Sequence, residues 1–185
     1  MQGQQAAAVA DALTQDAPVS ASGHQVMHCD QLAAGAIDEL AANYQLTAIK
    51  VDAGDAIPGS YWGAPEAGLI SDRLFWRADT PLHSLLHELA HWVCIAPARR
   101  TALDTDAGGD DDEECAVCYL EVLLADHWQS FGAARCLADM DAWGYSFREG
   151  SATAWFEGDG REARAWLLGH RLIQADGTPT WRLRT

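Results

Sequence analysis

The segment from residue 79 to residue 96 constrains the fold most strongly, because it predicts an amphipathic helix with both ends marked. Asp79 or Thr80 can cap the start, and Pro81 suits the first helical position. The helix should end before Pro97, since proline restricts the residue that precedes it. Apolar residues recur at helical spacing and predict a buried stripe made of Leu82, Leu85, Leu86, Leu89, Ala90 and Val93.

Two histidines lie on the flank of this helix, in the pattern H-E-x-x-H at residues 87–91. Residues four apart lie one turn apart on the same helix face, so His87 and His91 can bind one Zn²⁺ from the same side. Glu88 follows the first histidine and therefore stands beside the metal. A general base must stand there to take a proton from a zinc-bound water.

A catalytic zinc has three protein ligands and one water, so a third ligand is needed. Residues 112–127 predict a second helix, with aspartates at its positive end and the adjacent carboxylates Glu113 and Glu114 in its first turn. Glu113 falls at the centre of the helix's apolar stripe, where a carboxylate needs a metal or a partner. Glu114 lies about 100° round the helix. The helical period therefore favours Glu113 as the third ligand, and Glu114 remains an alternative.

The two predicted helices resemble those of a known family. The residues from Leu85 to Trp92 resemble the metal-binding helix of ArdC-type metallopeptidase domains. Glu114 is followed by small residues, then by Tyr119 and the leucines at 123–124. This order is similar to the glutamate-bearing helix of ImmA/IrrE-type and ArdC-type domains. The chain thus resembles a minimal gluzincin, a zinc metallopeptidase with an H-E-x-x-H helix and a following glutamate ligand.

The resemblance covers residues 70–126 and has one departure, because Ala125 stands where ImmA/IrrE-type domains have a proline. It implies an α+β, zincin-like fold. In that fold a small twisted sheet packs on the H-E-x-x-H helix and a following glutamate-bearing helix. The motif match also selects Glu114 as the third ligand, with Glu113 as the alternative.

The remaining pattern predicts a single domain from residue 21 to residue 185, with residues 1–20 as a frayed helix or flexible tail. Gly/Pro-rich and acidic segments separate the predicted elements, and no linker is long enough to divide two domains. We expect helices at 31–43, 132–143 and 162–172, strands at 46–51 and 68–77 with a turn near Ser71-Asp72, and β-structure at 144–156 and 181–183.

Composition excludes several classes of partner. The net charge is −15 with a single lysine, which disfavours broad nucleic-acid binding and leaves no basic patch for anionic membranes. No apolar run reaches the length of a membrane span, and the first residues lack the pattern of a signal peptide. The five cysteines form an odd set without framework spacing, so we expect reduced thiols and a cytoplasmic location.

Peptide hydrolysis also needs a donor that stabilises the oxyanion and a surface that holds the peptide. The edge of the strand at 68–77 is a candidate for the peptide, by β-augmentation. His83, one turn before His87, is expected to be a solvated or core residue rather than a fourth ligand. Cys115 and Cys118 are expected to be small helical residues. The candidate oxyanion donors are Tyr145, Arg148, His127 and Tyr61.

Two functions from different classes follow. The first is a zinc-dependent metallopeptidase that cleaves a peptide or protein substrate, with Glu88 as base and His87, His91 and Glu114 as zinc ligands. By family likeness, the substrate would be an intracellular regulatory protein. The second is a catalytically inactive zinc-binding module that regulates or binds a partner, of the phage or plasmid defence type. A third reading is a chance motif in an unrelated helical domain.

Overall fold

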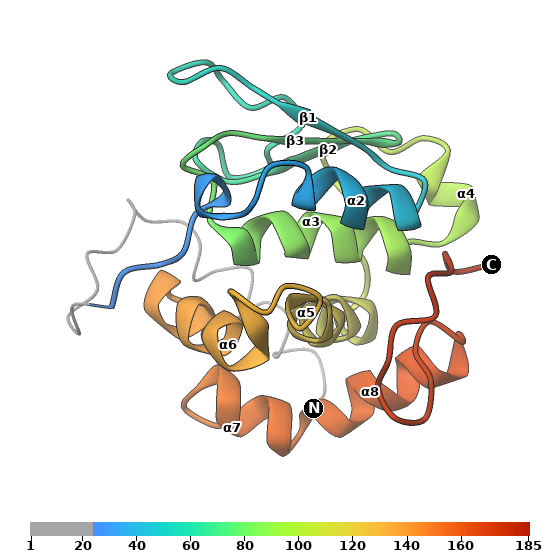
Figure 1. Cartoon of the computed structure of the whole chain (residues 1–185). Coiled ribbons are helices and arrows are strands. Elements are labelled where there is room, and N and C mark those ends of the chain that lie inside the picture. The colour runs from blue at the N-terminus through green and yellow to red at the C-terminus, as the bar shows by residue number, and fades with distance from the viewer. Residues whose placement is uncertain (1–23) are drawn as a thin grey trace.

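Helix α3 (Leu82–Cys94) runs through the middle of the computed structural model, which describes residues 24–185 (Figure 1). Its predicted apolar stripe is fully buried. The helix starts one residue later than expected: Pro81 is the N-cap, and the Thr80 hydroxyl accepts a hydrogen bond from the Arg77 backbone at 2.9 Å. It ends before Pro97 as predicted, and the short helix α4 (Pro97–Arg100) follows.

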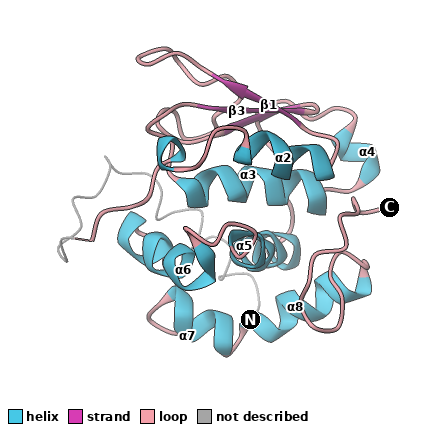
Figure 2. Ribbon diagram, viewed as in Figure 1, coloured by secondary structure: helices cyan, strands magenta, loops and turns pink. Residues whose placement is uncertain are grey.

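Three strands form one small sheet: β1 (Thr47–Lys50), β2 (Gly68–Ile70) and β3 (Arg73–Trp76). The order is β1-β3-β2, with β1 parallel and β2 antiparallel to the central β3. The turn between β2 and β3 falls at Ser71 and Asp72 as expected, and Ser71 takes a positive φ of 53°. The sheet lies against one side of α3 (Figure 2).

The outer edge of β2 is already paired, so the expected docking edge for a peptide is wrong for this strand. The Leu69 N–H donates to the Gly59 carbonyl at 3.2 Å, and the Leu69 carbonyl accepts from the Thr105 N–H at 3.1 Å. Gly68 allows this close approach, since a Cβ there would lie 2.1 Å from the Pro58 carbonyl oxygen. Two loops therefore cover the edge of β2.

The predicted helix at 31–43 is shorter than expected. A 3₁₀ turn, η1 (Cys29–Gln31), comes first, and α2 (Ala36–Asn43) begins only after Gly35, whose φ is +82°. This left-handed glycine separates the two elements. Helix α2 packs against β1 (Figure 1).

Four helices lie on the side of α3 that faces away from the sheet (Figures 1 and 2): α5 (Asp111–Ala125), α6 (Gly132–Trp143), α7 (Ala152–Glu157) and α8 (Gly160–Gly169). Helix α5 packs directly on α3, and α6 and α8 pack on α5. The Asp110 side chain caps α5 by accepting from the Glu113 N–H at 2.9 Å.

The β-structure expected at 144–156 is wrong. The Ser151 hydroxyl accepts from the Ala154 N–H at 3.1 Å and starts α7 instead. The β-prone aromatic residues pack in the core, with the rings of Phe147 and Trp155 stacked at 4.8 Å. Residues 181–183 form no strand either, and the Arg184 N–H fixes this segment to the Val93 carbonyl at 3.0 Å.

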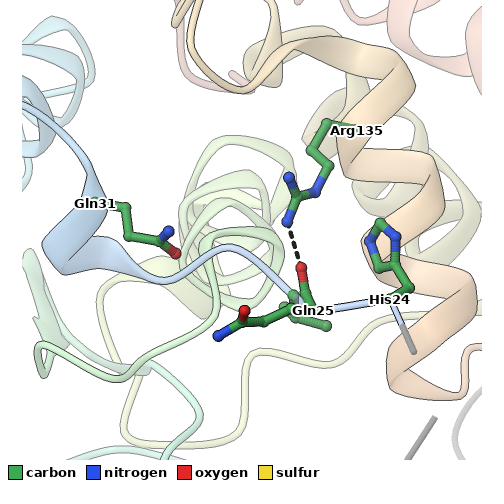
Figure 3. Close-up of a pocket in the computed structure, with 5 residues that line it drawn as sticks. His24, Gln25, Gln31 and Arg135 are labelled. Atoms are coloured by element: carbon green, nitrogen blue, oxygen red, sulfur yellow. Dashed lines mark hydrogen bonds between the residues drawn. The ribbon is translucent and has the colours of Figure 1, made fainter.

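The first described residues are tied to α6 by Asp139, which is fully buried. Its carboxylate accepts from the Met27 N–H at 2.8 Å and the Arg135 Nε at 2.6 Å. Arg135 also donates to the Gln25 carbonyl, as Figure 3 shows. A hollow of about 400 Å³ opens here, and none of its lining residues is a candidate metal ligand.

Two further predictions concern the first residues of the chain and the length of its helices. The flexible tail predicted at residues 1–20 lies outside the described residues. Among residues 24–185, every helix is too short or too polar to span a bilayer.

Candidate metal centre

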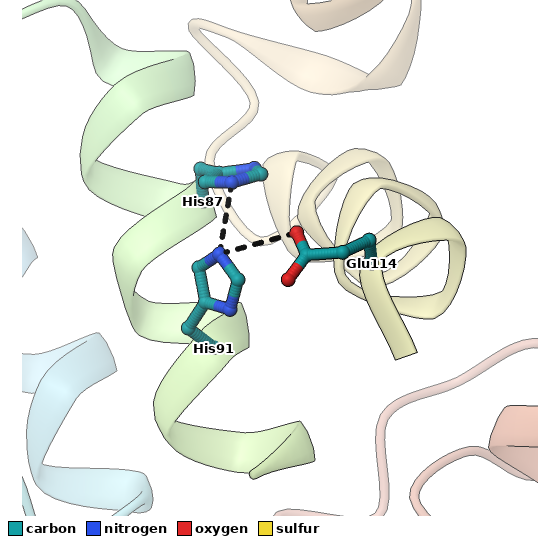
Figure 4. A group of neighbouring side chains, drawn as sticks. All are labelled: His87, His91 and Glu114. Atoms are coloured by element: carbon teal, nitrogen blue, oxygen red, sulfur yellow. Dashed lines mark hydrogen bonds and ion pairs between the residues drawn. The ribbon is translucent and has the colours of Figure 1, made fainter. Parts of the chain in front are cut away.

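The two histidines of α3 converge as their spacing predicts (Figure 4). The Nε2 atoms of His87 and His91 lie 3.0 Å apart, and the ring centroids lie 4.6 Å apart. The side chain of His91 is 7% exposed and that of His87 is 18% exposed. One turn of helix therefore brings both imidazoles to a single point that solvent can reach.

Glu114 joins them from the first turn of α5. Its Oε2 lies 3.7 Å from the His91 Nε2 (Figure 4), and its Oε1 accepts from the Gly109 N–H at 2.6 Å. The potential ligand atoms of His87, His91 and Glu114 all lie within 4.8 Å of one another. The structure thus brings together the three residues that the sequence analysis named as ligands.

Glu113, the alternative third ligand, is occupied elsewhere. It is 3% exposed, and its two oxygens accept from Arg99 at 2.9 Å and from Arg184 at 2.6 Å. A buried carboxylate needs a partner, and these arginines meet that need. Arg99 also donates to the carbonyls of Ala107 and Gly108. These hydrogen bonds hold the segment just before Gly109, whose N–H orients the Glu114 carboxylate.

Glu121 is a site residue that the sequence analysis missed. This fully buried residue places Oε2 3.0 Å from the His87 Nδ1, so it holds the nitrogen that faces away from His91. Glu113, the non-ligand of the Glu113–Glu114 pair, does not hold this nitrogen, because its two oxygens pair with Arg99 and Arg184. The signal was present: Glu121 lies seven residues after Glu114, two turns along the same helix face. Carboxylates of this kind fix the tautomer of a ligating histidine.

A second group of potential ligands shares His87, because Cys118 and Glu121 also place ligand atoms within 4.8 Å of it and of each other. Cys118 is 3% exposed and Glu121 is fully buried, so an ion there would have no position open to substrate. The Glu114 side chain is 24% exposed. Exposure therefore favours the group with Glu114 as the open metal site, and Glu121 as the support for His87.

The donor set fits zinc. With zinc–ligand bonds of about 2.0–2.1 Å, tetrahedral neighbours lie about 3.3 Å apart. The measured separations of 3.0 Å between the two Nε2 atoms and 3.7 Å between His91 and Glu114 bracket that value. Two imidazoles and one carboxylate leave the fourth position for water, as catalytic zinc sites require.

The two imidazoles differ in basicity. Burial alone would lower the pKa of His87, but hydrogen bonds to Cys118 and Glu121 outweigh it and hold that pKa well above its usual value. Burial, with repulsion from His87, holds the pKa of His91 well below its usual value. His91 is therefore a neutral imidazole at pH 7, the form that binds metals.

Glu88 lies beside the ligands on α3. Its Oε2 is buried and has no hydrogen-bond partner among residues 24–185. Burial raises the pKa of Glu88 to about 8, and the charges of Glu66 and Glu114 add to the effect while His87 opposes it. A nearby cation favours the ionised form of a carboxylate, so metal binding would lower this pKa.

Among the four candidate oxyanion donors, Tyr145 packs close to the first ligand, with its ring 6.2 Å from the His87 ring. Arg148 is exposed and pairs with Asp159, His127 packs against Trp181 at 5.6 Å, and Tyr61 is 57% exposed. Burial raises the pKa of Tyr145, so it keeps its proton and can donate.

His83 is a core residue, which was one of its two expected environments. It is fully buried, and burial lowers its pKa to about 3. Neither ring nitrogen has a partner among residues 24–185. Cys115 and Cys118 are free thiols on α5.

The chain was compared with protein-family models, with curated proteins and with solved structures, and none of the three comparisons found a match.

Proposed function

We propose that this protein is a zinc-dependent metallopeptidase. The observation that carries the proposal is the convergence of His87, His91 and Glu114 within 4.8 Å, with Glu88 next to the first ligand. The arrangement of a small sheet and helix α5 on opposite sides of α3 supports the zincin-like fold that the motif resemblance implies.

Each residue has one role in this proposal. Zinc, when bound, would polarise the scissile carbonyl and make its bound water more acidic. Glu88 would accept a proton from the attacking water at its carboxylate and later deliver it to the leaving amine. Glu121 fixes the His87 ring, and the Gly109 N–H fixes the Glu114 carboxylate. Tyr145 donates to the oxyanion that forms on the carbonyl oxygen.

The substrate in this proposal is a peptide or protein. Loops cover the edge of β2, so the peptide does not extend the sheet there. It would bind instead where the side chains of His87 and Glu114 are partly exposed.

A Glu88→Gln variant tests the proposal, because glutamine keeps the shape and cannot act as a base. We expect about one zinc per chain in both wild type and variant, and peptide cleavage only in wild type. The loss should be on the order of 100-fold or more. The measurement is metal analysis together with mass spectrometry of a peptide library. Equal cleavage by both proteins would contradict the role of Glu88.

A second candidate is the catalytically inactive zinc-binding module. The observation that favours it is the enclosure of the Glu88 Oε2, which solvent does not reach. This candidate predicts one zinc per chain, no cleavage of any library peptide, and no effect of Glu88→Gln. The same experiment therefore separates the two candidates.

A further inference from the structure

Glu66, a carboxylate outside the ligand set, lies at one end of the candidate site. The next residue, Ala67, donates its backbone N–H to the Ser84 hydroxyl at 3.0 Å. Ser84 is buried on α3, one turn before Glu88 and on the same face. This contact fixes Glu66 beside the turn of α3 that precedes the proposed base.

Trp143 holds Glu66 from the other side. Its indole Nε1–H donates to the Glu66 Oε1 at 2.6 Å. The ring of Trp143 packs against His83, with centroids 5.4 Å apart, and His83 lies one turn before His87. Glu66, just before β2, and Trp143, at the end of α6, therefore meet over the turn of α3 that precedes the proposed ligand His87.

The charge of Glu66 has no cationic partner in the part of the chain that the structure describes. The structure shows no ion pair for Glu66 across residues 24–185, whereas Glu113 has two arginine partners and Asp139 has one. Residues 1–23 contain no lysine, arginine or histidine. Its Oε2 accepts no hydrogen bond within the described residues.

The neighbouring buried groups also lack partners. The Glu88 Oε2 and both ring nitrogens of His83 are buried without hydrogen bonds across residues 24–185. Buried polar groups are hydrogen-bonded in most native proteins, so an unpaired group calls for an explanation. An acidic side chain beside such groups is explained by a ligand that supplies hydrogen-bond donors and positive charge.

We propose that Glu66 recognises a cationic group of the substrate, an ammonium or a guanidinium, next to the bond that is cleaved. This inference rests on the proposed peptidase function and names its substrate class. The cationic group is either a lysine or arginine side chain or a free amino terminus, since both present the same N–H donors. Glu66 is then a specificity residue.

The test measures binding as well as turnover. Zinc-loaded Glu88→Gln protein is titrated with three labelled octapeptides by fluorescence anisotropy: an acetylated peptide with a central lysine, the same peptide with glutamate, and a neutral peptide with a free amino terminus. Each titration is repeated with Glu66→Gln added. Glutamine removes the charge but keeps an oxygen that accepts from Trp143. Glu157→Gln, which removes one charge from an exposed position on α7, is the matched control.

We expect a cationic peptide to bind about tenfold or more tightly than the acidic one, because charge-assisted hydrogen bonds are strong. Glu66→Gln should reduce this preference to less than about twofold, and Glu157→Gln should leave it unchanged. The lysine and free-amine arms identify the source of the cation. Titrations in 0.15 M salt, where the Debye length is about 8 Å, screen the attraction of distant charges and so reduce the contribution of the overall charge of −15.

A preference that survives Glu66→Gln, or no preference at all, overturns the inference. The test separates failure of this inference from failure of the proposed function. Loss of the preference in Glu66→Gln together with no cleavage by the Glu88-intact protein would uphold the recognition site and reject the peptidase. Cleavage without a Glu66-dependent preference would do the reverse.

Discussion

At the scale of single residues, Glu113 and Glu114 show how adjacent side chains take different roles. Glu113 faces the core and is held by Arg99 and Arg184, while Glu114 faces the histidines. The apolar period of the helix predicted that Glu113 is buried, and the motif match selected Glu114 as the third ligand. The partners of Glu113 were not predictable, because Arg184 reaches it from a segment distant in sequence.

Glu114→Ala and Glu113→Ala should therefore separate metal binding from stability. We expect Glu114→Ala to lose zinc and keep the fold. Glu113→Ala should keep zinc but lose about 2–3 kcal/mol of unfolding free energy. That figure is below the range for a fully buried pair, because Arg99 and Arg184 are partly exposed. Metal analysis and urea unfolding measure the two effects. Loss of zinc in Glu113→Ala alone would reverse the assignment.

Glu88 gives the metal-free protein a distinct pH dependence. Burial raises its pKa to about 8 from an ordinary value of 4.5, so between these pH values the folded state holds a proton that the unfolded state has released. Stability contributed by protonated Glu88 is therefore present below pH 4.5 and falls as the pH rises to about 8. The slope is about 1.4 kcal/mol per pH unit at most.

The Glu88→Gln variant should lack this dependence. Urea unfolding of wild-type and variant protein, both freed of metal with a chelator, measures the free energy of unfolding between pH 5 and pH 8. We expect the variant to gain stability relative to wild type as the pH rises, because glutamine stays neutral. Parallel curves for the two proteins would mean that Glu88 titrates normally.

At the scale of elements, the sequence predicted the helices whose bounds depend on residues within or next to them. Helix α3 and helix α6 lie close to their expected bounds, because apolar spacing and prolines or glycines mark them. The prediction of β-structure at residues 144–156 was wrong for a physical reason. Aromatic residues have strand propensity, but the Ser151 cap and the packing of the rings favour a helix there. The pairing of the β2 edge depends on distant loops and leaves no local signal.

The cap of α5 should matter for metal binding, since Glu114 lies in the first turn after it. Asp110→Ala removes the side chain that accepts from the Glu113 N–H and should cost about 1 kcal/mol. We also expect weaker zinc affinity, because that turn frays more often. Ser151→Ala removes the corresponding cap of α7 and is the control. Competition with a zinc-binding dye should show weaker zinc binding only for Asp110→Ala.

At the scale of the whole molecule, α3 links the sheet to the helical layer, and the candidate site lies where α5 crosses it (Figure 1). The sequence predicted the α+β class and the two helices of the site. It did not predict Glu121 as the support of His87, or Glu66 at the end of the site. Both depend on which segments meet in space, and no spacing rule within one element gives that.

The central claim is that His87, His91 and Glu114 bind one zinc ion. X-ray absorption spectroscopy of zinc-loaded protein tests it most directly, because zinc–sulfur bonds near 2.3 Å differ from nitrogen and oxygen bonds near 2.0–2.1 Å. We predict only nitrogen and oxygen ligands, with two imidazoles, and loss of bound zinc in His91→Ala. A sulfur ligand would place the ion at the group of His87, Cys118 and Glu121 instead, and protein that binds no zinc would contradict the claim altogether.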